Sequence, residues 1–436
     1  MGEIRRHSIE TNIKRFLVDN VVTILFFIIC LIGIILADQP MAYIVGEISS
    51  RLFRNLIIIL ALLIPVWAGM GMNFSIVVGA MAAQIGIIVS INFSITGIIG
   101  LVAAFIVSVP LSLFFGNLVG RLFNKTKGQE MITGMILGFF AKGLYDLVFM
   151  FLCGPVIPVK NPSLLLTNGI GLITPITLDD ATNAAINNIW KMPLDKGLTM
   201  ILIIAVAVKL LSVLWRKYKR GEELSWKKQY GLFALIVLFA AYMILISVSE
   251  TVKFALSFTQ MPVGTGILIV IVCIYTTFLS KTKLGSDINA VGQNMNIAVS
   301  MGIPADKIRI TAIMISTLLA GLGQLVFIQD IGNFTTYTAH ENVGTFAIAA
   351  LLVGGASIQK ASISHAVIGA LLFHTMFVVS PLAGRNLFDN AQLGEYFRVF
   401  ACYAVIAVAL ALHAWKTVMA KQEENSEEAE IKAAEH

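Results

Sequence analysis

The stretch ITGIIGLVAAFIVSVPLSLFFGNLVGRLFNKTK, residues 95–127, decides the fold class of this chain. It carries no charged residue from Ile95 to Gly120 and then ends in the basic segment RLFNKTK. A helix of this length can cross the roughly 30 Å hydrocarbon core of a bilayer. A basic end is typical of the cytoplasmic side of such a helix. The stretch therefore predicts a transmembrane helix that ends in the cytoplasm.

The rest of the chain repeats this pattern. Of its 436 residues, 57% are hydrophobic and 13% are charged, whereas soluble domains carry about 25% charged residues. Apolar runs of about 18 to 25 residues recur, instead of the short alternating segments that a transmembrane β-barrel would need. We predict an all-α fold, a polytopic bundle of about 10 to 12 transmembrane helices.

Twelve apolar segments are the predicted spans, at 20–37, 53–70, 74–91, 95–122, 130–154, 197–216, 230–249, 262–280, 310–329, 344–357, 363–381 and 394–415. The segment 344–357 is too short for a full span. We expect it to be a half-span or re-entrant element, which is tolerated only where protein covers its ends.

Basic residues gather in alternate connections, at the N-terminus 1–19 and at 121–127, 215–228 and 281–309. By the positive-inside rule these segments face the cytoplasm, and twelve spans return the C-terminus to the same side. The segments on the outer side are then 155–196, 331–343 and 382–393. The expected layout is a cytoplasmic N-terminus 1–19, a membrane domain 20–415 and a charged cytoplasmic tail 416–436.

Several kinds of chemistry have no motif in this sequence. There is no GxxxxGK[ST] loop for nucleotide phosphates, and the four cysteines lack the spacing of a metal site. His365 and His374 have no carboxylate companions on their predicted span. We therefore predict no catalytic residues, no metal site and no cofactor, and a transport protein instead of an enzyme.

Charges inside the predicted spans are few, and the clear exception is Lys142 with Asp146. Four residues apart on one helix, they share a face and can pair with each other. Either they are a structural pair, or they contact a substrate or ion in a transport pathway. Asn73, Ser75 and Gln84 are further pathway candidates, because a buried polar side chain at membrane depth needs a partner.

The polar stretch NAVGQNMNIAVSMGIPADKIRI, residues 289–310, interrupts two apolar spans. Ser286 and Asp287 are expected to cap a helix of little more than one turn that Gly292 stops. Asn294 is expected to cap a second short helix, Met295 to Met301, that Gly302 stops.

The second of these short helices carries one apolar face, formed by Met295, Ala298, Val299 and Gly302. A short element of this kind suits a cleft on another protein, and the alternative is an ordinary ordered loop. The chain shows no energy source of its own for transport. A driving partner would have to bind a cytoplasmic segment such as this one.

The segment GSDINAVGQNMNIAVSMGI, residues 285–303, resembles the cytoplasmic signature of permease subunits of ATP-binding-cassette importers for sugars, nucleosides and branched-chain amino acids. The matching positions are Gly285, Ala290, Val291, Gly292, Asn294, Ala298, Gly302 and Ile303. Asn289 stands where the family has a basic residue, and Ile297 replaces one alanine. The segments LLAGLGQ (318–324) and AIAALLVGGASI (347–358) are also similar to the family.

The resemblance implies a permease subunit in a bacterial cytoplasmic (inner) membrane that imports a small polar solute, a sugar or nucleoside. It implies cytoplasmic ATPase subunits, a second permease subunit that is identical or paralogous, and an external substrate-binding protein as partners. It also implies a coupling helix that contacts the ATPase through Ser286, Asp287, Ala290, Val291, Gly292, Asn294, Met295, Ala298 and Gly302. The competing hypothesis is a self-sufficient secondary transporter coupled to an ion gradient through Lys142 and Asp146.

Overall fold

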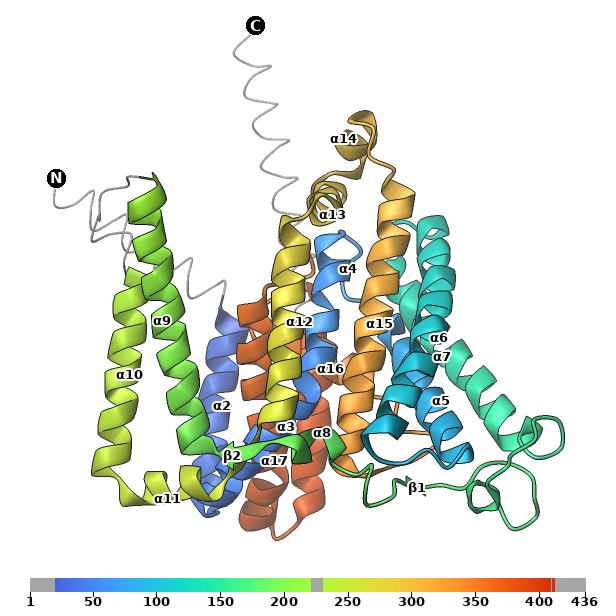
Figure 1. Ribbon diagram of the computed structural model, residues 1–436, viewed down its shortest axis with the longest axis horizontal. Coiled ribbons are helices and arrows are strands. Elements are labelled where there is room, and N and C mark those ends of the chain that lie inside the picture. Colours follow the sequence, from blue (N-terminus) through green and yellow to red (C-terminus); the bar gives the residue numbers. More distant parts are fainter. Residues whose placement is uncertain (1–19, 221–229, 409, 412–436) are drawn as a thin grey trace, which may run out of the picture.

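The computed structural model describes residues 20–220, 230–408 and 410–411. The predicted N-terminal segment 1–19 and the charged tail 416–436 lie outside the described residues. The described part is mainly helical, with four short strands, so the all-α prediction is confirmed (Figure 1).

Eight helices of the described ranges are long and apolar enough to cross a membrane. They are Met41–Trp67 (α3 and α4), Phe74–Asn92 (η1 and α5), Gly97–Lys125 (α6), Glu130–Leu152 (α7 and η2), Val263–Lys281 (α12), Ala305–Ile331 (α15), Ile363–Phe388 (α17) and Ala391–Val408. Two shorter apolar helices are α2 (Val21–Ala37) and α16 (Val343–Val353). Each of the twelve predicted spans overlaps a helix of the structure.

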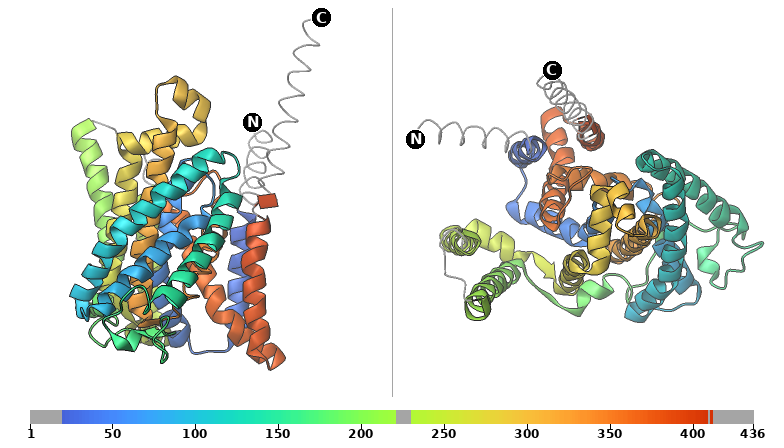
Figure 2. Two further views of the ribbon diagram at one scale, coloured as in Figure 1. Left: turned by 90° about the vertical axis from the view of Figure 1, so that its right-hand side faces the viewer. Right: turned by 90° about the horizontal axis from the view of Figure 1, so that it is seen from above.

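A helical hairpin stands beside the main bundle (Figures 1 and 2). It consists of α9 (Leu194–Arg220) and α10 (Tyr230–Val248). After α10 the chain turns sharply, because α11 (Glu250–Phe258) is bent by 103° from the end of α10. The hairpin is joined to the bundle through β2 (Lys191–Pro193), which pairs with β3 (Gln260–Pro262).

The connections of the bundle gather at two opposite ends (Figure 1). The α6–α7 connection lies at the same end as α13 (Lys283–Gln293) and α14 (Met295–Ser300). The opposite end carries α8 (Ala185–Ile189), α11 and β1 (Ile176–Thr177), which pairs with β4 (Asn333–Phe334). The two predicted basic connections that the structure describes throughout, 121–127 and 281–309, therefore lie at one end of the bundle, and the connection 155–196 contributes to the opposite end.

Two helix starts differ from the prediction. The second predicted span begins at 53, whereas α3 (Met41–Ala61) begins 12 residues earlier. The ninth begins at 310, whereas α15 begins at Ala305. In both cases the helix begins with a segment that contains charged residues, so the hydropathy pattern alone places its start too late.

The centre of the bundle is α15, which packs against α3, α5 and α6. Two of these neighbours, α5 and α6, approach each other closely because a glycine lies at their contact. A Cβ atom on Gly86 of α5 would lie 2.3 Å from the carbonyl oxygen of Ala104 on α6. Small residues allow membrane helices to approach this closely, and van der Waals packing then holds them together.

This packing predicts that Gly86→Val destabilises the bundle. The added side chain must push α5 away from α6, and overpacking of this kind costs about 1–3 kcal/mol. Gly143→Val in α7 is the matched control, because nothing lies within 4 Å of its Cβ position. The thermal unfolding midpoint of the purified protein should fall for Gly86→Val alone, and equal shifts for the two variants would contradict the close packing.

Candidate functional site

A cavity of about 1050 Å³ opens in the wall of the bundle. Its walls come from α7, from the turn before α5, from α16 with the segment that precedes it, and from the last described helix. Its polar and charged lining residues are Gln129, Glu130, Lys142, His340, Glu341, Asn342, Thr345, Gln359 and Tyr403. A mainly apolar cavity with a few convergent polar groups is the usual form of a small-molecule site.

Two interrupted helices meet at this cavity. The first is broken after α4 (Leu63–Trp67), where Gly69 and Gly71 adopt φ of 71° and 68° before the 3₁₀ turn η1 (Phe74–Ile76). The second is the half-span α16, which has 11 residues and therefore measures about 16 Å. The segment predicted at 344–357 is therefore a short helix, as expected, and is too short to cross a membrane alone. In transporters, interrupted helices of this kind often line the binding site.

The pathway candidates Asn73 and Ser75 do not line the cavity. Asn73 Oδ1 accepts hydrogen bonds from the Ser75 backbone N–H at 3.0 Å and from the Ser75 hydroxyl at 2.5 Å. Both side chains are buried, and Phe74 between them faces the cavity instead. The two residues therefore hold the turn in the shape that brings Phe74 to the cavity.

Gln84, the third polar candidate, is also buried away from the cavity, but it contacts a residue that lines it. Its Oε1 atom lies 2.9 Å from Nδ1 of His340. His340 also packs edge-on against Tyr145, with ring centroids 4.9 Å apart. Gln84 therefore contributes to the cavity indirectly, by contacting the His340 ring that lines it.

Lys142 and Asp146 form the predicted pair, with Nζ and Oδ2 2.7 Å apart. Lys142 Nζ also lies 3.1 Å from Oε1 of Glu341, in the segment ahead of α16. The pair therefore belongs to a three-residue cluster that joins α7 to the α16 segment. The prediction did not include Glu341, because nothing local in the sequence links it to a helix 199 positions earlier.

The connection between α12 and α15 contains the two short helices that were predicted, although the first begins earlier than expected. α13 begins at Lys283, and its N-cap is Thr282, whose hydroxyl accepts a hydrogen bond from the Gly285 N–H at 3.2 Å. The prediction that Ser286 and Asp287 cap this helix is wrong. A capping side chain was available one turn earlier, at the end of α12.

Gly292 does not stop α13, which continues to Gln293. A Cβ atom on Gly292 would lie 2.0 Å from the carbonyl oxygen of Trp67, and one on Gly69 would lie 2.8 Å from Cα of Gly292. The predicted stop is therefore wrong for a physical reason. This glycine allows backbone-to-backbone contact between α13 and the broken end of α4.

The second short helix agrees with the prediction at its ends. Asn294 Oδ1 accepts a hydrogen bond from the Ile297 N–H at 3.1 Å and so caps α14. Gly302, with φ of 81°, follows the helix in the left-handed conformation that favours glycine.

The predicted apolar face of α14 is divided between the core and the surface. Ala298 is 1% exposed, whereas Ile297, Val299 and Met301 are 58%, 54% and 74% exposed. We call these last three residues the α14 tip. Because Ala298 packs inward, the α14 tip is the apolar surface that this helix offers to a partner. It lies beyond the bundle at the end that carries α13 (Figures 1 and 2).

A second connection runs from this loop to the cavity wall. Arg309, in the first turns of α15, forms a buried ion pair with Glu130, which lines the cavity. Its Nε atom also donates to Asn124 Oδ1 at 3.0 Å. Close by, Lys127 and Asp306 form a more exposed pair at 2.8 Å. The sequence pattern had indicated Arg309 only as a loop charge that sets orientation.

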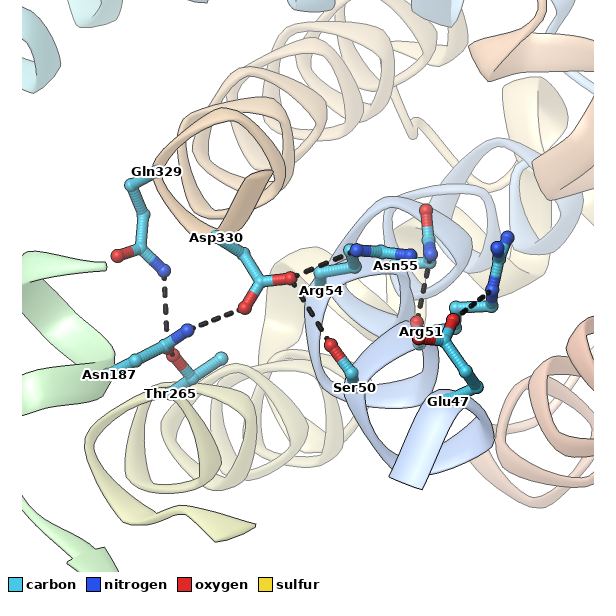
Figure 3. A network of polar contacts seen from close by, with 9 residues as sticks. All are labelled: Glu47, Ser50, Arg51, Arg54, Asn55, Asn187, Thr265, Gln329 and Asp330. Atoms are coloured by element: carbon cyan, nitrogen blue, oxygen red, sulfur yellow. Dashed lines mark hydrogen bonds and ion pairs between the residues drawn. The ribbon is translucent and has the colours of Figure 1, made fainter. Parts of the chain in front are cut away.

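A further polar network lies at the opposite end of the bundle (Figure 3). Asp330 of α15 accepts from Arg54 of α3 at 3.2 Å and from Asn187 of α8 at 2.5 Å. Asn187 in turn accepts from Thr265 of α12 at 2.5 Å. Charges within the spans are therefore more numerous than the sequence indicated. These residues do not line the large cavity, and they tie four helices together.

Among the described residues, no group of three or more His, Cys, Asp or Glu side chains is arranged to hold a metal ion.

A large cavity, interrupted helices and charged residues within apolar helices are typical of membrane transport proteins. Residues 181–410, more than half of the chain, match the family described as the branched-chain amino acid transport system permease component. The chain belongs to this family.

Three curated relatives illustrate its similarities. It is 34% identical over 128 residues to the autoinducer 2 import system permease protein LsrC of Yersinia enterocolitica, covering 29% of this chain and 34% of the relative. It is 33% identical over 149 residues to the nucleoside ABC transporter permease protein NupB of Lactococcus lactis, covering 34% and 38%. It is 28% identical over 197 residues to the xylose transport system permease protein XylH of Haemophilus influenzae, covering 42% and 48%.

The chain thus spans about a third to a half of the length of these relatives. No solved structure matches it.

The buried Arg309–Glu130 pair should contribute more to the free energy of unfolding than the exposed Lys127–Asp306 pair. Replacement of each cation by methionine tests this difference. Arg309→Met leaves the Glu130 carboxylate buried without its partner, which costs about 3–5 kcal/mol. Lys127→Met breaks the more exposed pair, where Lys127 and Asp306 are 41% and 61% exposed, and costs less than about 1 kcal/mol. The free energy of unfolding in mixed detergent micelles measures both, and equal losses would contradict the structural role of the Arg309–Glu130 pair.

Proposed function

We propose that this chain is the transmembrane permease subunit of an ATP-driven importer in a bacterial cytoplasmic membrane. Its cargo is a small polar solute, a sugar or a nucleoside, delivered by an external binding protein. Membership of this family and the similarity to three import or transport permeases support this proposal. Partner ATPase subunits hydrolyse ATP, and a second permease subunit, identical or paralogous, completes the membrane part.

One observation carries the mechanism: α13 contacts the broken end of α4 through Gly292. The α14 tip is exposed and apolar at the cytoplasmic end, where an ATPase cleft would receive it. A displacement of the tip moves α13, and α13 presses directly on the turn at Gly69 that borders the cavity. ATP binding by the partner then favours one of two arrangements of the cavity wall, which is the thermodynamic requirement for alternating access.

Residues proposed for ATPase coupling now fall into two groups. Asn294 and the α14 tip form the surface that contacts the ATPase. Ala290, Val291, Gly292, Met295 and Ala298 lie at least partly buried and transmit the movement inward. Of the remaining coupling residues, Ser286 and Asp287 lie within α13, and Gly302 follows α14.

The self-sufficient secondary transporter is the second hypothesis, and the two make opposite predictions in liposomes. Reconstituted alone, this chain should show no concentrative uptake of radiolabelled xylose or adenosine under an imposed proton or sodium gradient. Addition of its ATP-binding-cassette ATPase, a second permease subunit and the binding protein should permit ATP-dependent uptake. Gradient-driven uptake by the chain alone, abolished by Lys142→Gln, would contradict the permease proposal.

The α14 tip predicts how the ATPase binds. Val299→Arg places a charge on the exposed apolar surface, and burial of that charge in a docking cleft is costly unless it is paired. Co-purification of the ATPase encoded with this permease should therefore fall at least tenfold, a loss of about 1.4 kcal/mol. Val299→Ala, which adds no charge, is the control and should retain the ATPase. Unchanged co-purification of Val299→Arg would contradict the docking role.

A further inference from the structure

The Lys142 cluster lies well inside the membrane part of the protein. Lys142 stands 12 residues after Glu130, the first residue of α7, which places it about 18 Å along that helix. The side chains of Lys142 and Glu341 line the cavity, and they are 30% and 36% exposed. Charged groups at this depth that face a cavity are expensive to keep, and they usually mark a pathway.

The cluster does not balance its own charge. One ammonium group lies between two carboxylates, Asp146 at 2.7 Å and Glu341 at 3.1 Å, so the three side chains together carry one negative charge. Glu130, the other charged residue among the described lining residues, is neutralised by Arg309. The end of the cavity near α16 is therefore negative.

We propose that Glu341 determines the charge selectivity of this cavity. Its carboxylate admits neutral and cationic solutes and repels anions, so that phosphorylated or carboxylated relatives of the transported solute are excluded. A cleft with low-dielectric walls focuses the field of such a charge, and the local concentration of anions falls accordingly. This inference rests on the proposed function, because it gives the solute selectivity of the cavity through which an imported solute would pass.

Of the two carboxylates in the cluster, Glu341 contributes more to the field inside the cavity than Asp146 does. Asp146 lies on the same helix as Lys142, at the shorter distance, and does not line the cavity. Lys142 is thus already balanced by its helix neighbour. Glu341 comes from a different segment and faces the cavity with the larger exposed fraction, so its charge is the one that an entering solute meets.

Thiol-reactive probes of opposite charge measure this field without knowledge of the solute. Thr345→Cys places a thiol on the cavity wall, in the first turn of α16 and four positions after Glu341. The full-length protein in proteoliposomes is treated with a cationic reagent, 2-(trimethylammonium)ethyl methanethiosulfonate, or with an anionic one, 2-sulfonatoethyl methanethiosulfonate. Each rate is divided by the rate of the same reagent with free 2-mercaptoethanol, and the protein with only its native cysteines gives the background.

The cationic reagent should react faster after this correction. Glu341→Gln should reduce the cation-to-anion rate ratio by about three- to tenfold, as expected for loss of one charge at this range in a partly hydrated cavity. Glu341→Asp should keep the ratio, and Glu341→Lys should reverse the preference. Glu250→Gln on α11, an exposed carboxylate at the outer end of the bundle and outside the cavity lining, is the matched control and should change nothing.

An unchanged ratio in both Glu341→Gln and Glu341→Lys would overturn the proposal, as would a faster reaction of the anionic reagent with the Thr345→Cys protein. Absence of reaction with both reagents, at Thr345→Cys and also at Met135→Cys on the opposite wall, would show that the cavity is closed to water and would overturn it too. The measurement needs neither ATPase nor transport. Its failure is therefore distinguishable from failure of the importer proposal.

Discussion

The functional arrangement depends on one contact, the approach of α13 to the broken end of α4 at Gly292 and Gly69. A Cβ atom on Gly292 would lie 2.0 Å from the Trp67 carbonyl oxygen, so only glycine permits the contact without a shift of one backbone. Such a contact has no flexible side chain between its two parts. A movement of the loop is therefore passed to the turn beside the cavity with little loss, as in a shear between closely packed helices.

Charged groups complete this connection between loop and cavity. Arg309 and Glu130 join the start of α15 to the first residue of α7, and Lys142 joins the middle of α7 to Glu341. The span formed by α7 and η2 is otherwise loosely held, since only 11% of its most apolar stretch is buried, the lowest value among the eight candidate spans described. A lightly packed wall fixed by a few ion pairs can change position without disturbing the core around α15.

The sequence predicted what depends on local pattern and membrane thickness. Each apolar run located a helix, although only eight of the twelve predicted spans are long and apolar enough to cross a membrane in the described residues. The Asn294 cap and the Gly302 end of α14 followed from local capping chemistry. The missed features depend on partners far away in the chain. Gly292 is read locally as a stop, although Trp67 and Gly69 make it a packing position. Glu341 likewise acquires its role only when the fold brings it to Lys142.

The most direct test of the central claim is hydrogen–deuterium exchange of the permease in complex with its ATPase, compared without nucleotide and with ATP and vanadate. If α13 moves the turn that follows α4, peptides covering 283–303 and 65–76 should change protection together. Gly292→Val should abolish the change at 65–76 while leaving that at 283–303, and Gln293→Val should abolish neither. A nucleotide-dependent change at 283–303 with none at 65–76 in the unmodified protein would contradict the account.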